Sequence, residues 1–91
     1  MIESVLINCI AEAIAKQEGY YKIGSLAQRN ANPGNLRSWG KRPINGGYAQ
    51  FLKLDGQPDP DAGWAALREQ VRKNIARGLT LVEFFAGKPG V

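Results

Sequence analysis

The sequence has 91 residues, a length typical of a single domain. Its formal net charge is +4 and its pI is near 9.5, so the domain is basic. It contains no histidine and one cysteine, which excludes Ser-His and Cys-His nucleophilic catalysis, most zinc sites and any internal disulfide. The positive charge favours an anionic partner, and a cell-wall polymer, nucleic acid and anionic lipid remain alternatives.

The N-terminus carries a short apolar run, Val5-Leu6-Ile7, flanked by Glu3 and Asn8. No basic region precedes this run, it is too short to span a membrane, and it lacks a small-residue cleavage site. We therefore expect no signal peptide and no membrane span. If the target lies in the cell wall, another factor must deliver the protein.

Residues 4–18 are predicted to form a helix with Ser4 as its N-cap. Apolar residues recur on one face at three- and four-residue spacing: Leu6, Ile10, Ala13 and Ile14. Further apolar residues lie around this face, which predicts a central helix buried on most sides. Cys9 is expected to be one of the small buried apolar residues.

Glu18 is predicted to be the last residue of this helix, because Gly19 suits the left-handed closing position. Its carboxyl group would then lie at the rim of an apolar surface, one turn after Ile14. Cleavage of a glycosidic bond needs a proton donor for the leaving oxygen, and a partly desolvated glutamic acid can supply that proton. Glu18 is therefore a candidate general acid. The alternative is a solvated glutamate at a helix end.

Residues 19–35 show no clear period and form a long connection, a kind of segment that is often functional. The connection ends in Asn32-Pro33-Gly34-Asn35, and Arg37 follows closely. Amide and guanidinium groups of this kind could hold a polar, hydroxyl-rich ligand beside Glu18. The alternative is an ordinary Pro-Gly type II turn followed by an outward-facing arginine.

Residues 36–39 and 48–54 are predicted to be two strands of a small antiparallel hairpin, joined by the turn-rich segment 40–47. Four aromatic residues in the connection and the predicted hairpin could stack on sugar rings or pack in the core: Tyr20, Tyr21, Trp39 and Tyr48.

Residues 62–77 are predicted to form the next long helix, with Asp61 as its N-cap and Gly78 after its end. Its buried stripe is predicted to be Trp64, Leu67, Val71 and Ile75. Thr80-Leu81-Val82-Glu83 matches a capping box and predicts a short helix over residues 81–86.

The helix over residues 62–77 also carries a basic patch: Arg68, Arg72, Lys73 and Arg77. A solvated helix face and a nucleic-acid-binding surface are both open interpretations of this patch. The sequence has no phosphate-binding glycine loop and no metal-ligand cluster, so we expect neither a cofactor nor a metal.

A second carboxylate would decide the mechanism of a glycan-cleaving enzyme. Asp61 already serves as the predicted N-cap, and Asp59 lies between two prolines. Asp55, which follows the second predicted strand, is the best candidate for a catalytic base. Without a base, one acid can still cleave the bond if the acetamido group of the substrate attacks the sugar.

Several of these segments together resemble a known family, the small phage and prophage proteins of the lysozyme-like superfamily. These proteins are similar to soluble lytic transglycosylases and endolysins. The resemblance covers residues 10–85, and it depends on four motifs in chain order: Glu18-Gly19-Tyr20, Arg29-Asn30-x-Asn32-Pro33-Gly34-Asn35-Leu36-Arg37, Gly47-Tyr48-Ala49-x-Phe51 and Gly63-Trp64-x-Ala66-Leu67. Its most specific part is the segment over residues 32–37.

The resemblance implies an α+β, mainly helical, lysozyme-like fold with a small antiparallel β-hairpin between the first long helix and the later helices. Residues 1–91 would form one such domain. Members of the family usually continue into a Tyr-Ala-Pro loop and a final helix, whereas this sequence stops at Val91. We therefore expect a domain that is truncated at its C-terminus or completed by a partner chain.

The resemblance also implies an activity, cleavage of the β-1,4 bond between N-acetylmuramic acid and N-acetylglucosamine in peptidoglycan. Glu18 would be the catalytic acid of a muramidase or lytic transglycosylase. The residues expected to contact the glycan are Tyr20, Asn32, Asn35, Arg37, Tyr48, Gln50 and Phe51. The protein would act from the host cytoplasm after delivery by another factor, or as a component of the virion.

Two other functions remain open at the level of sequence. The first is a non-catalytic module that binds glycan or another virion protein on the same fold. The second is a small basic nucleic-acid-binding protein that uses the patch between Arg68 and Arg77.

Overall fold

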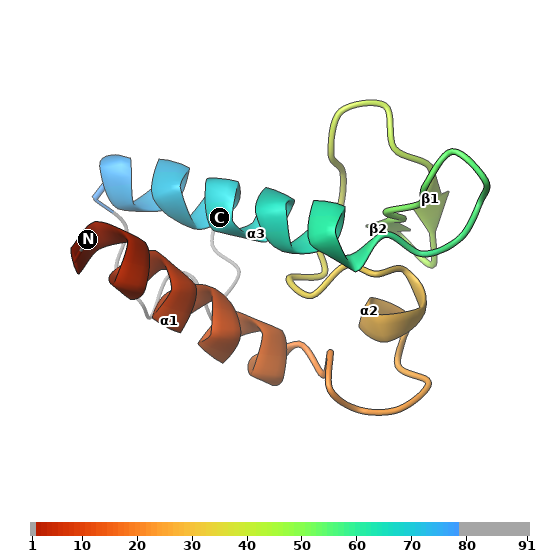
Figure 1. The fold of residues 1–91 in the computed structure, drawn as a ribbon, viewed down its shortest axis with the longest axis horizontal. Helices are drawn as coiled ribbons and strands as arrows, with labels where there is room; N and C mark the ends of the chain where they lie inside the picture. Colours follow the sequence, from red (N-terminus) through yellow and green to blue (C-terminus); the bar gives the residue numbers. More distant parts are fainter. Residues whose placement is uncertain (1, 79–91) are drawn as a thin grey trace.

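The computed structural model describes residues 2–78, with side chains from residue 4 onward. In chain order its elements are α1 (Ile2–Gln17), α2 (Leu26–Arg29), β1 (Ile44–Asn45), β2 (Tyr48–Ala49) and α3 (Pro60–Ala76). Figure 1 shows α1 and α3 side by side in opposite directions, with the loops and the hairpin gathered where α1 ends and α3 begins. The described residues thus form a small, mainly helical α+β fold whose hairpin lies between the first and last helices.

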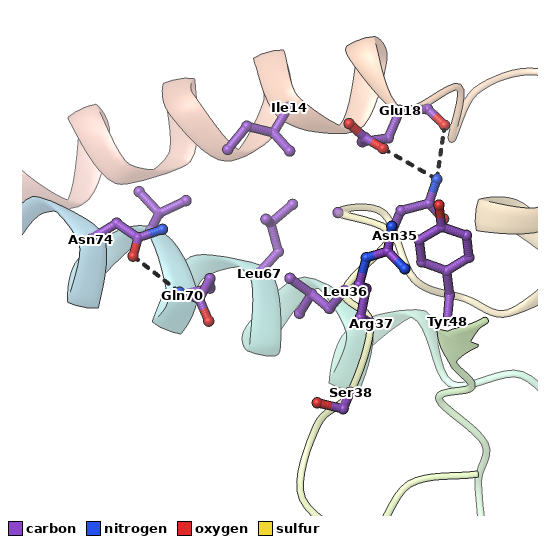
Figure 2. A pocket seen from close by; sticks show the side chains of 12 residues that line it. Ile14, Glu18, Asn35, Leu36, Arg37, Ser38, Tyr48, Leu67, Gln70 and Asn74 are labelled. Atoms are coloured by element: carbon purple, nitrogen blue, oxygen red, sulfur yellow. Dashed lines mark hydrogen bonds between the residues drawn. The ribbon is translucent and has the colours of Figure 1, made fainter. Parts of the chain in front are cut away.

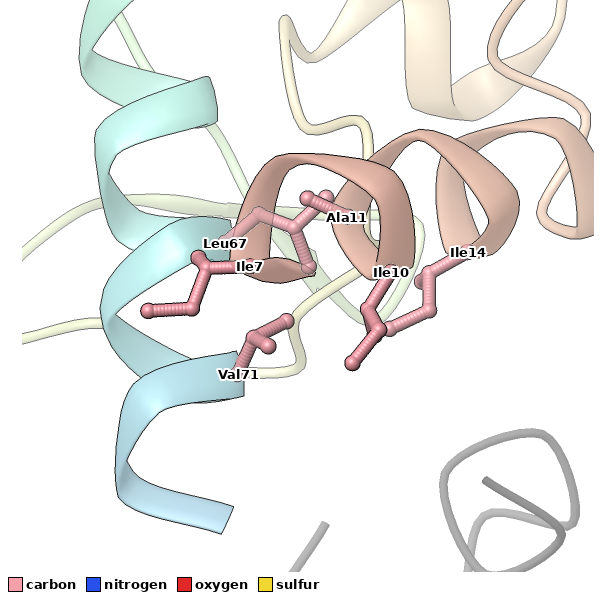
Figure 3. Close-up of a cluster of buried hydrophobic side chains, with 6 residues drawn as sticks. All are labelled: Ile7, Ile10, Ala11, Ile14, Leu67 and Val71. Carbon is pink, nitrogen blue, oxygen red and sulfur yellow. The ribbon is translucent and has the colours of Figure 1, made fainter. Parts of the chain in front are cut away.

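The main core lies between α1 and α3. Six buried side chains meet there, as Figure 3 shows: Ile7, Ile10, Ala11 and Ile14 from α1, and Leu67 and Val71 from α3. The predicted helix over residues 4–18 is confirmed, with its last helical residue at Gln17. Gly19 follows at φ +79°, the left-handed conformation that closes a helix and that glycine adopts without strain.

The buried face of α1 differs from the predicted one. Ile10 and Ile14 are buried as expected, but Ala13 is exposed and Leu6 keeps 49% of its surface exposed. Cys9 is also exposed, so its predicted burial is wrong. Because α1 is apolar on nearly all sides, the spacing of its residues does not fix which side meets α3. The prediction of a helix buried on most sides fails for this outer face.

Helix α3 begins earlier than predicted. Its N-cap is Asp59, whose carboxylate accepts a hydrogen bond from the Ala62 backbone N–H at 3.2 Å, so Asp61 lies inside the first turn. Pro60 suits the first helical position, because its missing N–H has no partner to lose there. Leu67 and Val71 are buried as predicted, whereas Trp64 is half-buried and Ile75 is exposed.

The hairpin is shorter than predicted, and its first strand lies at a different place in the sequence. β1 pairs with β2 in antiparallel fashion, with Asn45 opposite Tyr48, around a turn made by Gly46 and Gly47. These glycines have φ +65° and +86°, and two successive positive φ angles make the two-residue turn that closes tight hairpins. The predicted strand over residues 36–39 is therefore wrong, although the Ala49 N–H donates to the Leu36 carbonyl at 2.8 Å.

A second core joins the hairpin region to the start of α3. It contains the buried residues Ala31, Ala49, Phe51 and Ala66. Gly63 permits this contact, because a Cβ atom at that position would lie 1.8 Å from the Ala31 carbonyl oxygen. The backbone of the loop therefore packs directly on the backbone of α3.

The long connection after α1 contains a helix that was not predicted. This helix is α2, whose N-cap Ser25 accepts a hydrogen bond from the Gln28 backbone N–H at 3.1 Å. The predicted short helix over residues 81–86 lies outside the described residues. Within residues 2–78, no helix has both the length and the apolar character needed to cross a membrane.

Candidate functional site

A cleft of about 390 Å³ lies between the end of α1, the loop after α2, the hairpin and α3. Figure 2 shows its side chains, which come from all four of these regions. The lining residues are Ile14, Glu18, Gly34, Asn35, Leu36, Arg37, Ser38, Tyr48, Leu67, Gln70, Val71 and Asn74. Among the predicted site residues, the cleft brings together Glu18, Asn35, Arg37 and Tyr48.

Glu18 lies at one end of this cleft, directly after the last residue of α1. Its backbone N–H still donates to the Ile14 carbonyl at 2.9 Å, so the helix fixes its position. The chain then turns at Gly19, and the Tyr20 N–H closes the helix end on the Ala15 carbonyl at 3.0 Å. The half-buried Glu18 side chain is thus held at the rim of the apolar core, as the sequence predicts.

Asn35 holds Glu18 from the opposite side of the cleft. Its side-chain Nδ2 donates to Glu18 Oε1 at 3.3 Å and to the Glu18 carbonyl at 3.4 Å. Asn35 has φ +47°, a conformation that asparagine adopts more readily than most residues. Within residues 2–78, no group donates a hydrogen bond to Glu18 Oε2 and no cation forms an ion pair with this carboxylate. One carboxylate oxygen is therefore positioned by the protein, while the other can contact a ligand.

The turn that presents Asn35 depends on close packing against α3. The Asn35 N–H donates to the Asn32 carbonyl at 3.0 Å, which closes the turn over Pro33 and Gly34. Gly34 does not have the positive φ that a type II turn requires. It lies against Leu67 instead, and a Cβ at Gly34 would come within 2.6 Å of the Leu67 Cδ1 atom.

Asn32 supports this turn from beneath and does not line the cleft. It is fully buried, and its Nδ2 donates to the carbonyls of Leu36 and Ala49, each at 2.9 Å. Its Oδ1 accepts from the Leu36 N–H at 2.9 Å. All of these contacts are to backbone groups, so Asn32 stabilises the loop. It does not line the cleft, where the predicted glycan contact would have to occur.

Asn30 has a similar supporting place, which the sequence did not predict. It is fully buried, and its Nδ2 donates to the Asn45 carbonyl at 3.0 Å while its Oδ1 accepts from Asn45 Nδ2 at 2.9 Å. Two buried amides therefore fasten the loop to the hairpin. Asn30 belongs to the Arg-Asn-x-Asn-Pro-Gly motif, and its presence in that motif could have indicated its importance for the loop.

Arg37 and Tyr48 form the rim of the cleft near Glu18. The Arg37 guanidinium carbon lies 5.5 Å from the centre of the Tyr48 ring, close enough for a cation–π contact. Arg37 is exposed and Tyr48 is half-buried, so both can contact a ligand in the cleft. This rim therefore combines a positive charge with an aromatic face.

Three other predicted glycan contacts lie outside the cleft. Tyr20 packs edge-on against Trp64 and Tyr21, with ring centres 5.5 and 5.3 Å apart. Phe51 is fully buried in the second core. Gln50 is half-buried, and its backbone N–H donates to the Pro43 carbonyl. None of the three is among the residues that line the cleft.

Asp55, the predicted catalytic base, also lies away from the cleft. It is exposed, and its Oδ1 accepts a hydrogen bond from the Gln57 N–H at 3.0 Å in a surface turn. Glu18 is the one carboxylate among the described residues that line the cleft. No group of His, Cys, Asp or Glu residues in the range 2–78 has an arrangement that could hold a metal ion.

The sequence did not predict Gln70 and Asn74, which line the far end of the cleft from α3. Their positions, three and seven residues after Leu67, place them on the same side of the helix as that core residue. Polar residues at core-facing positions of α3 were therefore the signal that could have identified them.

Three residues of the predicted basic patch have contacts within the chain. Arg72 forms an ion pair with Glu69 at 3.0 Å, and the Lys73 ammonium lies 5.4 Å from the centre of the Trp39 ring. The Arg77 guanidinium donates to the side-chain oxygen of Asn74. These contacts engage part of the patch that the nucleic-acid interpretation requires.

Comparisons of this chain with protein-family models, with curated proteins and with solved structures found no match.

Proposed function

We propose that this protein is a peptidoglycan-cleaving enzyme with a lysozyme-like fold, in which Glu18 is the general acid. The bond cleaved is the β-1,4 bond between N-acetylmuramic acid and N-acetylglucosamine. The observation that carries the proposal is the position of Glu18, which is held at the end of a sugar-sized cleft by the amide of Asn35. The motifs that resemble phage and prophage lysozyme-like proteins give the substrate.

The single carboxylate in the cleft favours a lytic transglycosylase over a hydrolase. An inverting hydrolase needs a second carboxylate to activate water, and a retaining one usually needs it as nucleophile. Asp55 is a poor candidate for either role, because it is exposed and already accepts a hydrogen bond in its own turn. A transglycosylase can use the substrate's own groups in place of that carboxylate.

The reaction then proceeds in two balanced steps. Protonated Glu18 gives its proton to the oxygen of the glycosidic bond, and that oxygen leaves as the 4-hydroxyl group of N-acetylglucosamine. The acetamido carbonyl oxygen of N-acetylmuramic acid attacks C1 as the bond breaks. In the second step Glu18 takes the proton of the 6-hydroxyl group, whose oxygen displaces the acetamido oxygen at C1 and forms a 1,6-anhydro sugar.

The remaining lining residues suit an anionic glycan. Arg37 and Tyr48 offer a positive charge and an aromatic face at the rim, and the net charge of +4 favours an anionic polymer. Ile14, Leu67 and Val71 supply an apolar floor for the less polar faces of sugar rings. Delivery by another factor or carriage in the virion remains part of this proposal.

The test compares a Glu18→Gln variant with the wild type on purified peptidoglycan sacculi. The substitution keeps the shape of the side chain and removes the transferable proton, so release of soluble fragments should fall by about 10²- to 10⁴-fold. Asp55→Asn is the matched control and should release fragments at the wild-type rate. A Glu18→Gln variant as active as the wild type would rule out the proposal. Wild-type protein that binds sacculi but releases no fragments would indicate a glycan-binding module.

A further inference from the structure

Two buried side-chain polar atoms among the described residues have no hydrogen-bond partner in the protein, Asn35 Oδ1 and Asn74 Nδ2. Both residues line the cleft. Buried polar atoms without a partner cost free energy, so native proteins seldom keep them without a reason such as a ligand. The cleft therefore offers a hydrogen-bond acceptor near Glu18 and a hydrogen-bond donor on α3.

The orientation of the Asn74 amide follows from its neighbours. Its Oδ1 accepts hydrogen bonds from Gln70 Nε2 at 3.1 Å and from the Arg77 guanidinium. A guanidinium group can only donate, so the atom that faces Arg77 must be the amide oxygen. The nitrogen must then be the other atom. Asn74 is fully buried, and the cleft is the described cavity that it lines.

Asn74 lies at the end of the cleft remote from Glu18, as Figure 2 shows. It is seven positions after Leu67 in α3, a distance of about 10 Å along the helix axis. Val71 lies between these two residues and is fully buried, so the floor beside Asn74 is apolar. This end of the cleft thus combines one buried amide donor and the polar side chain of Gln70 with the aliphatic side chain of Val71.

We infer that Asn74 selects for an N-acetyl group on a sugar that binds away from Glu18. An acetamido group has a carbonyl oxygen that can accept from Asn74 Nδ2 and a methyl group that can pack on Val71. A free amino group offers neither and would bring a charge to an apolar surface, which is costly. The inference uses the proposed function for the identity of the sugar, whereas the donor and the apolar floor are properties of the structure.

The test measures binding of N-acetylglucosamine oligomers and of fully de-N-acetylated oligomers by calorimetry. Glu18→Gln protein is used as the parent so that no substrate is consumed. The parent should bind the acetylated oligomer about tenfold more tightly, as expected for one good hydrogen bond with its methyl contact. Asn74→Asp keeps the oxygen that Gln70 and Arg77 need but replaces the donor with an acceptor, so this preference should disappear.

Asn8→Asp, on the exposed side of α1, is the matched control for the added charge and should keep the preference. If circular dichroism shows that Asn74→Asp does not fold, Asn74→Leu is measured in its place with the same expectation. A parent without the preference, or an Asn74 variant that retains it, would overturn the inference. Release of fragments from sacculi by wild-type protein is recorded separately. If the Asn74 variant loses the preference for acetylated oligomers but wild-type protein releases no fragments, the proposed activity is wrong and the inference about Asn74 is supported.

Discussion

The helix pair and the loop that follows α2 are held together by different interactions. α1 and α3 pack through aliphatic side chains such as Ile7 and Val71. The loop is fixed by the buried amides of Asn30 and Asn32, which bond to backbone and side-chain groups of the hairpin region. Apolar packing is non-directional, whereas hydrogen bonds require a particular geometry. The helices therefore provide a surface, and the loop provides the accurate placement of Asn35.

The cleft lies where these two regions meet. Glu18 comes from the end of a packed helix, and Asn35 comes from a loop held by amides. A change in either region should therefore alter the cleft, but by a different route. Weakening the helix pair should lower global stability, while loss of a buried amide should also release the loop from Glu18.

The largest effect on stability is expected from Asn32→Ala. The substitution removes three hydrogen bonds and leaves the Leu36 N–H, the Leu36 carbonyl and the Ala49 carbonyl without that buried partner. The free energy of unfolding should fall by roughly 3 kcal/mol. Urea denaturation measures this change, with Asn8→Ala on an exposed face as control. Equal midpoints for the two variants would contradict the proposed support of the loop by Asn32.

A smaller effect is expected from Ile7→Val in the helix pair. Ile7 is 2% exposed in the main core, so loss of one methylene group should lower the free energy of unfolding by about 1 kcal/mol. For a domain of this size the thermal midpoint should fall by roughly 4–8 °C. Leu6→Val, on the exposed side of the same helix, should change the midpoint much less. A larger shift for Leu6→Val would mean that the outer face of α1 is the buried one.

The smallest effect concerns Tyr21, whose exposed hydroxyl donates a hydrogen bond to the Glu12 carboxylate. This bond raises the pKa of Tyr21 from 10.0 to about 12. Because the folded value is above the unfolded one, the stabilisation is complete below pH 10 and is lost as the pH rises toward 12. Water screens this contact, since Tyr21 is 52% exposed, so the change in stability should be slight.

An alkaline titration followed by ultraviolet absorbance measures the Tyr21 pKa directly. Tyr21→Phe should remove one tyrosine ionisation from the upper end of the curve. Glu12→Gln should move that ionisation toward pH 10, because the carboxylate that opposes it is gone. An unchanged curve for Glu12→Gln would show that the Tyr21–Glu12 bond does not form in solution.

The sequence predicted those features that depend on local signals. The period of apolar residues identified α1 and α3, and Gly19 placed Glu18 at the end of α1. Asn35 and Arg37, which the motif grouped with Glu18, line the same cleft as Glu18. The overlooked helix α2 also had a local signal, because Ser25 and Gln28 stand at capping-box spacing.

Features that depend on contacts between distant segments were not predictable in this way. The short hairpin turns at Gly46 and Gly47, and its residue Asn45 also bonds to Asn30, which lies 15 residues earlier in the chain. The side of α1 that packs against α3 is the buried side, and the spacing of apolar residues within α1 does not show which side that is. In the sequence Asn74 is an ordinary polar residue of a helix, and only the folded structure shows that it lines the cleft.

The most direct test of the account is mass spectrometry of the soluble products that wild-type protein releases from purified peptidoglycan. A single acid in the cleft predicts 1,6-anhydro-muropeptides, which Glu18→Gln should not produce. Reducing muropeptides would contradict the single-acid mechanism and require a base that the described cleft does not contain. An absence of any product from folded wild-type protein would contradict the enzymatic function itself.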